Sequence, residues 1–438
     1  MNLENLKSLF TDKGCQKIFV KKLSPNDNSK NQVYLGGGFE ILNILPISKI
    51  ETFGAGDWKR ERFKAKINFS WIGDDSNIYP APQSQLILYP KYPEVRFSGF
   101  LAQCANPPSE LMTKRLADRL LFISVTSNGA ILGYVASPSS LIAKEFNSVK
   151  TSDVGVFKVI ELLQTKNSKQ LLLQELKRIH SQNWIASKRL DKHRNILPCN
   201  ASNCGGYTLE AELGIIPNGY SEPDYLGWEV KQFGVSNFQR INSSVITLMT
   251  PEPTDGIYVS KGIDKFIHEY GYKDKTGQSG REDRLNFGGV HKVGTRHPST
   301  DLKMELIGFD TEEGKIRNTD GRIALVDTKG NEAASWSFSA LLLHWNRKHN
   351  QACFVPSLSE TKYERKYQYG NNVILGIGTD FQFFLKAMSI GTIYYDPGIK
   401  MENASTKPKI KRRSQFRMVS KNLKSLYKTN ELVDVTNY

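Results

Sequence analysis

The sequence contains no uninterrupted run of about 18 apolar residues, the length that a membrane-spanning helix needs. Its first residues, MNLENLKSLFTDKGC, lack the apolar segment of a signal peptide. The five cysteines are scattered, and the closest pair, Cys199 and Cys204, has the wrong gap for a C-x-x-C zinc site. His344 and His349 are also wrongly spaced for the H-E-x-x-H zinc motif. We therefore expect a cytoplasmic protein with reduced thiols and no membrane partner.

The composition is that of an ordinary globular protein with a strong excess of positive charge. The 438 residues are 39% hydrophobic and 24% charged, which excludes a wholly disordered chain. This length predicts two or three domains. Lysine and arginine number 59 against 44 acidic residues, a net charge of +15. A polyanion, and nucleic acid first of all, is the expected partner, although a basic protein without one has the same composition.

The pattern of short runs predicts two domains of different class. From residue 17 to 134, apolar or alternating runs are separated by Asp, Asn, Gly and Pro clusters, which is typical of an all-β barrel or sandwich. One helical segment, 107–120, interrupts them. From residue 161 onward, predicted helices alternate with strands, which is typical of an α/β domain. We place the domains at 1–160 and 161–438.

Four predicted elements of the second domain matter for function. Leucine and isoleucine recur at helical steps over 161–187, and 208–215 reads as a second helix with Thr208 as its N-cap. The segment 227–233 reads as a strand, and 335–349 as a later helix.

The most informative stretch is SEPDYLGWEVKQF, residues 221–233. On a strand Glu229 and Lys231 share one face, and Val230 points to the other, into the core. The Tyr-Leu-Gly bend can bring the Asp224 carboxylate beside that of Glu229. Two neighbouring carboxylates suit Mg²⁺, and the adjacent lysine could orient a water or stabilise charge on a phosphorus centre. A solvated Asp, Glu and Lys on an edge strand is the alternative interpretation.

The second domain resembles the MvaI/BcnI family of restriction endonucleases with their PD-(D/E)xK motif. The matching segments run in order through roughly residues 170–420: NWIASKR, GGYTLEAELGI, PDYLGWEVK, VITLMTPEPTDG, SWSFSALL and SQFRM. The resemblance implies that Asp224, Glu229 and Lys231 are catalytic and that Glu210 lies near the metal. The alternative for Glu210 is an exposed helix acid.

The same resemblance implies how DNA is recognised. Arg417 matches an arginine that reads guanine in the major groove, and arginine can pair with guanine O6 and N7. Residues 391–399, GTIYYDPGI, depart from the family, which has another base-reading arginine there. A monomer acting at a five-base CC-N-GG type site is what the resemblance implies.

The C-terminal region is strongly basic. Residues 400–428 hold ten lysines or arginines and a single acid, Glu402. Such a run is usually a solvated face, but Phe416, Met418 and Tyr427 are interleaved with the charges. We count Arg412 and Arg413 among the candidate DNA contacts.

The first domain resembles the EcoRII-like DNA-binding pseudobarrel. The segment FVKKLSPNDNSKNQVYLG matches one of the two arms with which that family clasps the major groove, and KYPEVRFSGF matches the second. A glutamate and an arginine in the second arm suit a G·C pair, although a salt-bridged hairpin without base contact is the alternative. The residues implied in DNA binding are Lys22, Ser24, Asn26, Asp27, Glu94 and Arg96.

Together the two resemblances imply a two-domain enzyme of UbaLAI-like architecture. The leading hypothesis is a Mg²⁺-dependent type II endonuclease that binds double-stranded DNA, with one or two copies of its site, and that needs a cognate DNA methyltransferase in its host. The alternatives are a strand-specific nickase of the mismatch-repair type and a catalytically inactive DNA-binding regulator.

Overall fold

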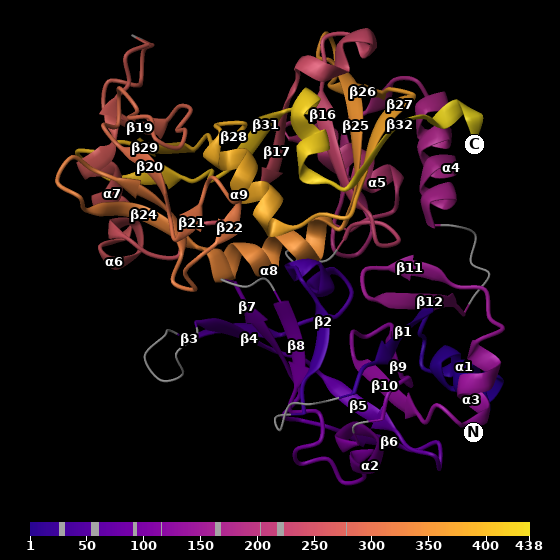
Figure 1. Cartoon of the computed structure of the whole chain (residues 1–438). Helices are drawn as coiled ribbons and strands as arrows, with labels where there is room; N and C mark the ends of the chain where they lie inside the picture. Colours follow the sequence, from indigo (N-terminus) through magenta and orange to yellow (C-terminus); the bar gives the residue numbers. More distant parts are fainter. Residues whose placement is uncertain are drawn as a thin grey trace. The chain divides into compact units, whose positions relative to one another are not determined.

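The computed structural model describes residues 1–25, 31–53, 61–90, 94–114, 116–162, 168–201, 203–216, 223–276 and 278–438. The chain divides into two compact units, Met1–Asn167 and Ser168–Tyr438. Each unit is described by itself below, with the element labels of Figure 1.

The first unit is built from two sheets. The seven-stranded sheet has the order β11-β12-β1-β9-β10-β5-β6, and the five-stranded sheet the order β2-β8-β7-β4-β3. All described pairings are antiparallel except β5 with β10. The strands are β1 Lys17–Leu23, β2 Val33–Gly36, β3 Lys49–Phe53, β4 Arg62–Lys66, β5 Phe69–Ile72, β6 Ile78–Pro80, β7 Gln85–Tyr89, β8 Glu94–Ser98, β9 Arg119–Val125, β10 Ile131–Ala136, β11 Ser152–Val154 and β12 Phe157–Glu161.

Aromatic rings fill the space between the two sheets of this unit. Phe69 of β5 lies 4.9 Å from both Trp71 of β5 and Phe97 of β8, measured between ring centroids. Phe97 in turn contacts Phe100 at 4.7 Å. These edge-on and tilted contacts stabilise the unit beyond simple burial.

The first unit also contains helices, and only the one within 107–120 was predicted from the sequence. They are α1 Leu3–Asp12, α2 Ser109–Thr113, α3 Leu141–Phe146 and the 3₁₀ helix η1 Phe39–Asn43. The helix predicted over 107–120 is wrong in extent, because β9 already begins at Arg119. Leu6 and Phe10 of α1 are buried against Val20, Phe122 and Ile142 in one core.

The second unit is mixed α/β. Its largest sheet has the order β13-β26-β25-β27-β32, with β16 paired to β25, and its other strands form smaller sheets of two to four strands. The strands are β13 Ile185–Ala186, β14 Lys188–Leu190, β15 Ile196–Pro198, β16 Glu229–Gly234, β17 Val245–Met249, β18 Tyr272–Lys273, β19 Arg284–Gly288, β20 Lys303–Ile307, β21 Phe309–Asp310, β22 Lys315–Ile316, β23 Arg322–Val326, β24 Glu332–Ser337, β25 Gln351–Glu360, β26 Lys366–Tyr369, β27 Asn372–Ile377, β28 Ile393–Tyr395, β29 Gly398–Glu402, β30 Lys409–Lys411, β31 Phe416–Val419 and β32 Thr429–Asp434.

The helices of this unit differ from the sequence prediction at their ends. They are α4 Ser168–Ser181, α5 Cys204–Glu212, α6 Ile257–Ser260, α7 Gly262–Tyr270, α8 Phe338–His349 and α9 Phe381–Ser389, with 3₁₀ helices η2 Phe238–Ser243, η3 Ser420–Leu426 and η4 Val435–Asn437. The N-cap position of α5 is Asn203, without a capping side-chain hydrogen bond, and not Thr208, whose hydroxyl bonds to the backbone of Lys188 instead. No helix among the described residues is long and apolar enough to cross a membrane.

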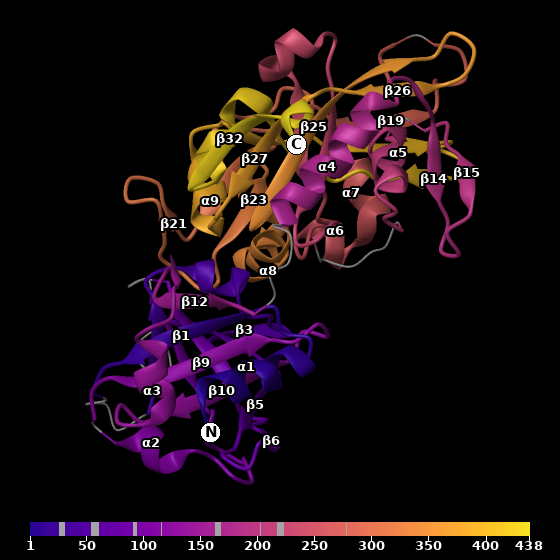
Figure 2. The ribbon, with the colours of Figure 1, turned by 90° about the vertical axis from the view of Figure 1, so that its right-hand side faces the viewer.

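The core of the second unit places the functional strand. α4 packs on one face of the large sheet, against residues of β25 and β27 (Figures 1 and 2). Leu172 and Leu176 of α4 are buried there with Val230 of β16 and Val355 of β25. β16 runs parallel to β25, with Glu229 opposite Ala352. Because side chains alternate along a strand, Glu229 and Lys231 face away from this core.

Candidate active site

A tight turn brings Asp224 to the start of β16. Tyr225 and Trp228 form an isolated antiparallel bridge, with backbone hydrogen bonds of 2.9 Å and 2.8 Å. The two residues between them, Leu226 and Gly227, both have positive φ angles of 48° and 86°, which is typical of a type I′ turn. Leucine is an uncommon residue in that conformation and marks a constrained backbone. The turn reverses the chain so that the Asp224 side chain accepts a hydrogen bond from the Val230 backbone at 3.1 Å.

Glu229 and Lys231 form an ion pair on the face of β16 opposite to Val230. The Lys231 ammonium donates a hydrogen bond to Glu229 Oε1. The Glu229 side chain has no solvent exposure, while 25% of the Lys231 side chain is exposed. Glu229 Oε2 is buried and has no hydrogen-bond partner among the residues that the structure describes. An unsatisfied carboxylate oxygen inside a protein is costly, so this atom is available to a ligand.

Glu210 joins the cluster from α5. This helix packs closely on β16, and glycine at position 205 permits the close approach. A Cβ atom at Gly205 would lie only 2.8 Å from Gln232 Oε1 and 3.0 Å from a Tyr367 ring carbon. The Tyr369 hydroxyl donates to the Gly205 carbonyl at 2.7 Å and fixes the helix start. Glu210 lies close enough to Asp224 for the charges of the two side chains to interact. It is partly buried, so the exposed helix acid is not what the structure shows.

The three acids interact with one another and with two lysines. Burial, and then the charge of Asp224, raise the pKa of Glu210 to about 7. Burial and the charge of Glu229 raise the pKa of Asp224 to about 6. Burial also acts to raise the pKa of Glu229, but the charges of Lys231 and Lys348 and the hydrogen bond from Lys231 outweigh it, and that pKa lies below its usual value. At neutral pH the cluster therefore carries ionised acids that repel one another.

The structure adds three side chains of α8 that sequence reasoning had not assigned to the site. Lys348 Nζ lies 3.8 Å from Glu229 Oε1. His349 is buried, stacks on Trp345 at 4.1 Å and interacts electrostatically with Glu229, as does His344. Burial lowers the pKa of His349 to about 3, so its ring is neutral. No local sequence pattern indicates that these residues join the site. They do so because α8 leads into β25, whose Ala352 pairs with Glu229.

The residues of this cluster fit a divalent cation. Within the described part of the chain, no group of three or more His, Cys, Asp or Glu side chains is arranged to hold a metal ion alone. Mg²⁺ does not require such a group, since it typically uses one or two carboxylates together with waters and substrate phosphates. Asp224 and the unpartnered Oε2 of Glu229 supply two hard oxygen donors. A cation there would also offset the repulsion between the acids.

The Glu210→Gln variant is expected to stabilise the metal-free protein at high pH. Above about pH 7 wild-type Glu210 is ionised in both the folded and the unfolded chain. The free energy of unfolding is then reduced by the full amount that corresponds to the raised pKa of Glu210. Below the ordinary value of 4.5 the group is protonated in both states and the penalty vanishes. We expect a gain on the order of 1–3 kcal/mol at pH 8, largely lost by pH 5, measured by unfolding in EDTA.

Glu212→Gln on the same helix is the matched control. Despite burial, Lys188, Gln182 and Arg178 lower the pKa of Glu212. Its stabilising contribution is therefore present above pH 4.5 and lost as the pH falls. This variant should be less stable than wild type at pH 8. A loss of stability at pH 8 in Glu210→Gln as well would contradict the electrostatic account of Glu210.

The two cysteines with the short gap form a disulfide, so the prediction of reduced thiols is wrong for this pair. Cys199 and Cys204 are joined, with Cα atoms 5.7 Å apart. Cys199 follows β15 and Cys204 is the first residue of α5. Their spacing excludes a zinc motif but permits this bridge, because the Cα separation lies within the range that a disulfide spans. Cys15, Cys104 and Cys353 are free thiols.

Reduction of this bridge is expected to destabilise the second unit by about 2 kcal/mol, since it closes a short loop. The double variant Cys199→Ser, Cys204→Ser should show the same loss. Chemical unfolding with and without dithiothreitol measures it, and the double variant should not respond to the reductant. Equal unfolding of wild type in both conditions would contradict a bridge that contributes to stability.

The candidate base-reading residues of the second unit lie on or beside β31. Arg417 Nη1 donates to Asp396 at 2.6 Å, and Arg417 stands opposite Tyr394 of β28. The Arg417 side chain is 28% exposed, and its buried Nε has no hydrogen-bond partner within the described part of the chain. Arg412 and Arg413 follow β30 and are exposed. Residues 391–399, which depart from the family pattern, therefore contact Arg417 directly through Asp396.

The candidate DNA contacts of the first unit fall into two groups. Lys22 is 68% exposed and forms an ion pair with Asp118 at 3.1 Å, and Ser24 follows β1. Asn26 and Asp27 lie outside the described residues. Glu94 and Arg96 form an ion pair at 3.1 Å on β8, and Arg96 also donates to Gln32 at 3.2 Å. This ion pair is the salt bridge of the alternative interpretation, and contact of Glu94 and Arg96 with a base pair stays a prediction.

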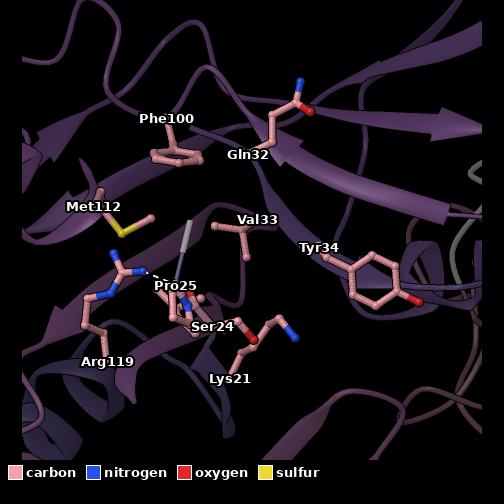
Figure 3. Close-up of a pocket in the computed structure, with 10 residues that line it drawn as sticks. Lys21, Ser24, Pro25, Gln32, Val33, Tyr34, Phe100, Met112 and Arg119 are labelled. Carbon is pink, nitrogen blue, oxygen red and sulfur yellow. Dashed lines mark hydrogen bonds between the residues drawn. The ribbon is translucent and has the colours of Figure 1, made fainter. Parts of the chain in front are cut away.

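A cavity of about 190 Å³ lies beside the first of these groups. Figure 3 shows Ser24 and Pro25 on one side of it, with Met112 and Phe100 opposite. The buried Arg119 closes the wall and donates to the Ser24 carbonyl at 3.0 Å. Arg119 thus anchors the chain at the end of β1, where the predicted DNA-contacting arm begins.

The comparisons with known proteins concern the second unit. The model of the MvaI/BcnI restriction endonuclease family matches residues 173–427, a segment that contains the whole acid–lysine cluster. Two solved structures of the MvaI restriction endonuclease are similar. The complex with its cognate DNA shares 18% identity over 61% of this chain and 99% of that chain, with a TM-score of 0.45. The form without DNA shares 17% identity over 62% and 99%, with a TM-score of 0.33. A search of curated proteins finds no match.

The family match covers more than half of the 438 residues. By class the protein is a type II restriction endonuclease. It belongs to the MvaI/BcnI restriction endonuclease family, with the first unit outside the matched segment.

Proposed function

We propose that this protein hydrolyses phosphodiester bonds of double-stranded DNA at a short G·C-flanked site of the CC-N-GG type, with Mg²⁺ as its cofactor. One observation carries the proposal. Asp224 and Glu229 lie at the start of one strand beside Lys231, and Glu229 offers a buried oxygen that forms no hydrogen bond with any described residue. This is the arrangement that a hydrolytic phosphodiesterase needs, since it joins hard oxygen donors to an ammonium group.

The chain's own residues divide the work of hydrolysis. A bound Mg²⁺, held by Asp224 and Glu229, would lower the pKa of a water and polarise the phosphate. The water oxygen forms a bond to phosphorus, the bond from phosphorus to the leaving sugar oxygen breaks, and a proton ends on that oxygen. Lys231 stays protonated, because the surrounding carboxylates outweigh burial and raise its pKa. It can therefore orient the water or stabilise negative charge on the phosphate oxygens.

DNA recognition is proposed to involve both units. In the second unit Arg417 would read a guanine, and Arg412 and Arg413 would contact the backbone. In the first unit the EcoRII-like arms would bind the same or a second copy of the site, through the exposed Lys22 and the Glu94–Arg96 pair. Two binding units on one chain raise the effective concentration of the nuclease at DNA, so a monomer suffices. A cognate methyltransferase would protect the host DNA.

Digestion of plasmid DNA followed by sequencing of the product ends tests the proposal. We expect discrete double-strand products that require Mg²⁺ and that share one G·C-flanked sequence at their ends. Products with random ends would exclude site-specific cleavage. Nicked circles alone would indicate a nickase of the mismatch-repair type. Bound but intact plasmid with every divalent metal would indicate an inactive DNA-binding regulator.

A further inference from the structure

A second lysine reaches the acid cluster from a different part of the chain. α8 ends at His349, and β25 begins two residues later at Gln351. Since Ala352 of β25 pairs with Glu229 of β16, the last turn of α8 is placed beside the Glu229 carboxylate. Lys348 lies in this turn. Its position therefore follows from the parallel pairing of two strands more than a hundred residues apart.

The two lysines are held differently. Lys231 donates a hydrogen bond to Glu229 Oε1. Lys348 lies 3.8 Å from the same oxygen, which is beyond hydrogen-bond distance, and 20% of its side chain is exposed. Lys231 is thus tied to the carboxylate, whereas the Lys348 ammonium is near the cluster, partly open to solvent and held by charge alone. Such a group can exchange its long ion pair for a closer anion.

The charges of the cluster favour this exchange. Burial and the charge of Asp224 raise the pKa of Glu210, burial and the charge of Glu229 raise the pKa of Asp224, and Lys348 is among the charges that lower both. A substrate phosphate at the cluster would be attracted to ammonium groups and repelled by the carboxylates. Lys348 is one of two lysines that can offset this repulsion.

We propose that Lys348 is a second catalytic lysine, which leaves its long ion pair with Glu229 to contact a non-bridging oxygen of the scissile phosphate. This inference rests on the proposed function. As the water oxygen bonds to phosphorus and the bond to the leaving sugar oxygen breaks, negative charge grows on the non-bridging oxygens, and the Lys348 ammonium stabilises it without giving up a proton. Interactions that strengthen in the transition state raise the rate rather than the affinity for DNA.

The test compares Lys348→Met and Lys348→Arg in the full-length protein. Lys329→Met, at an exposed turn between β23 and β24, is the matched control. Three quantities are measured: the single-turnover cleavage rate with Mg²⁺, DNA affinity with Ca²⁺, and Mn²⁺ affinity without DNA by electron paramagnetic resonance. Lys348→Met should cleave about 10²-fold more slowly. Its DNA affinity should change less than about three-fold, and Lys348→Arg should recover much of the rate.

The Mn²⁺ affinity separates a catalytic role from a structural one. Removal of a positive charge beside the carboxylates cannot weaken cation binding electrostatically, so Lys348→Met should bind Mn²⁺ as tightly as wild type or more tightly. Weaker Mn²⁺ binding together with slow cleavage would overturn the inference, because Lys348 would then support the shape of the cluster. An unchanged cleavage rate would overturn it as well.

Two further outcomes are informative. If Lys348→Met does not fold, Lys348→Gln, which keeps a polar end without the charge, replaces it and must show the same slow cleavage. If wild type and Lys329→Met cleave no DNA, the proposed function fails and the inference falls with it. If wild type, Lys329→Met and Lys348→Met all cleave equally, the inference alone fails.

Discussion

The Glu229→Gln variant is expected to cleave DNA at least about 10³-fold more slowly than wild type. Glu229 is fully buried, and its Oε2, which has no hydrogen-bond partner among the described residues, is a candidate metal-binding oxygen of the cluster. Glutamine keeps the shape of the side chain but replaces an anionic oxygen by a neutral amide, which binds Mg²⁺ poorly. A loss of about 4 kcal/mol in metal-assisted stabilisation corresponds to that factor. Single-turnover cleavage at saturating Mg²⁺ measures it.

DNA affinity in the presence of Ca²⁺ provides the control for this variant. Glu229 is buried within the cluster, so the variant should still bind DNA within a few-fold of wild type. A rate within ten-fold of wild type would contradict the role of Glu229. A general loss of DNA binding would instead show that the substitution disturbs the fold around β16.

The Lys231→Met variant is expected to lose both activity and stability. Methionine has a similar length but no charge, so Glu229 would keep only the long ion pair with Lys348 at 3.8 Å. Removal of one partner from a buried ion pair typically costs about 3–5 kcal/mol, because the remaining charge stays buried. Cleavage should fall by about 10² or more, since Lys231 is the ammonium nearest to the carboxylates.

The stability loss in Lys231→Met should depend on pH in a defined direction. The lysines lower the pKa of Glu229, so their stabilising effect is present above the ordinary value of 4.5 and is lost as the pH falls. Unfolding by urea at pH 7.5 and pH 4 measures this. The double variant Glu229→Gln, Lys231→Met should recover part of the stability at pH 7.5. A loss of equal size at both pH values would contradict the ion-pair explanation.

The local chemistry of the site was predictable because its elements are adjacent in the sequence. Alternation along one strand is enough to place Glu229 and Lys231 on one face and Val230 in the core. The bend before the strand was also predictable, since Gly227 suits a positive φ angle. The spacing could not show that Leu226 shares this conformation or that Glu229 Oε2 has no partner.

The remaining features depend on contacts between distant segments. Lys348 and His349 join the cluster because β25 pairs with β16, and no local pattern encodes that pairing. The start of α5 was misplaced because the Cys199–Cys204 bridge and the close approach at Gly205 extend the helix before Thr208. The arginine predicted to read guanine is held by Asp396, a contact across two strands that the sequence alone does not show.

The most direct test of the central claim is digestion of one plasmid by wild type and by Asp224→Asn, each with and without Mg²⁺. Asp224 accepts a hydrogen bond from the Val230 backbone, and asparagine can keep that bond through its amide oxygen. The fold and DNA binding should therefore persist while the anionic donor is lost. We expect discrete linear fragments from wild type with Mg²⁺, and intact plasmid in the other three reactions. Equal cleavage by Asp224→Asn, or cleavage by wild type in the absence of any divalent metal, would contradict the assignment of this cluster as the active site.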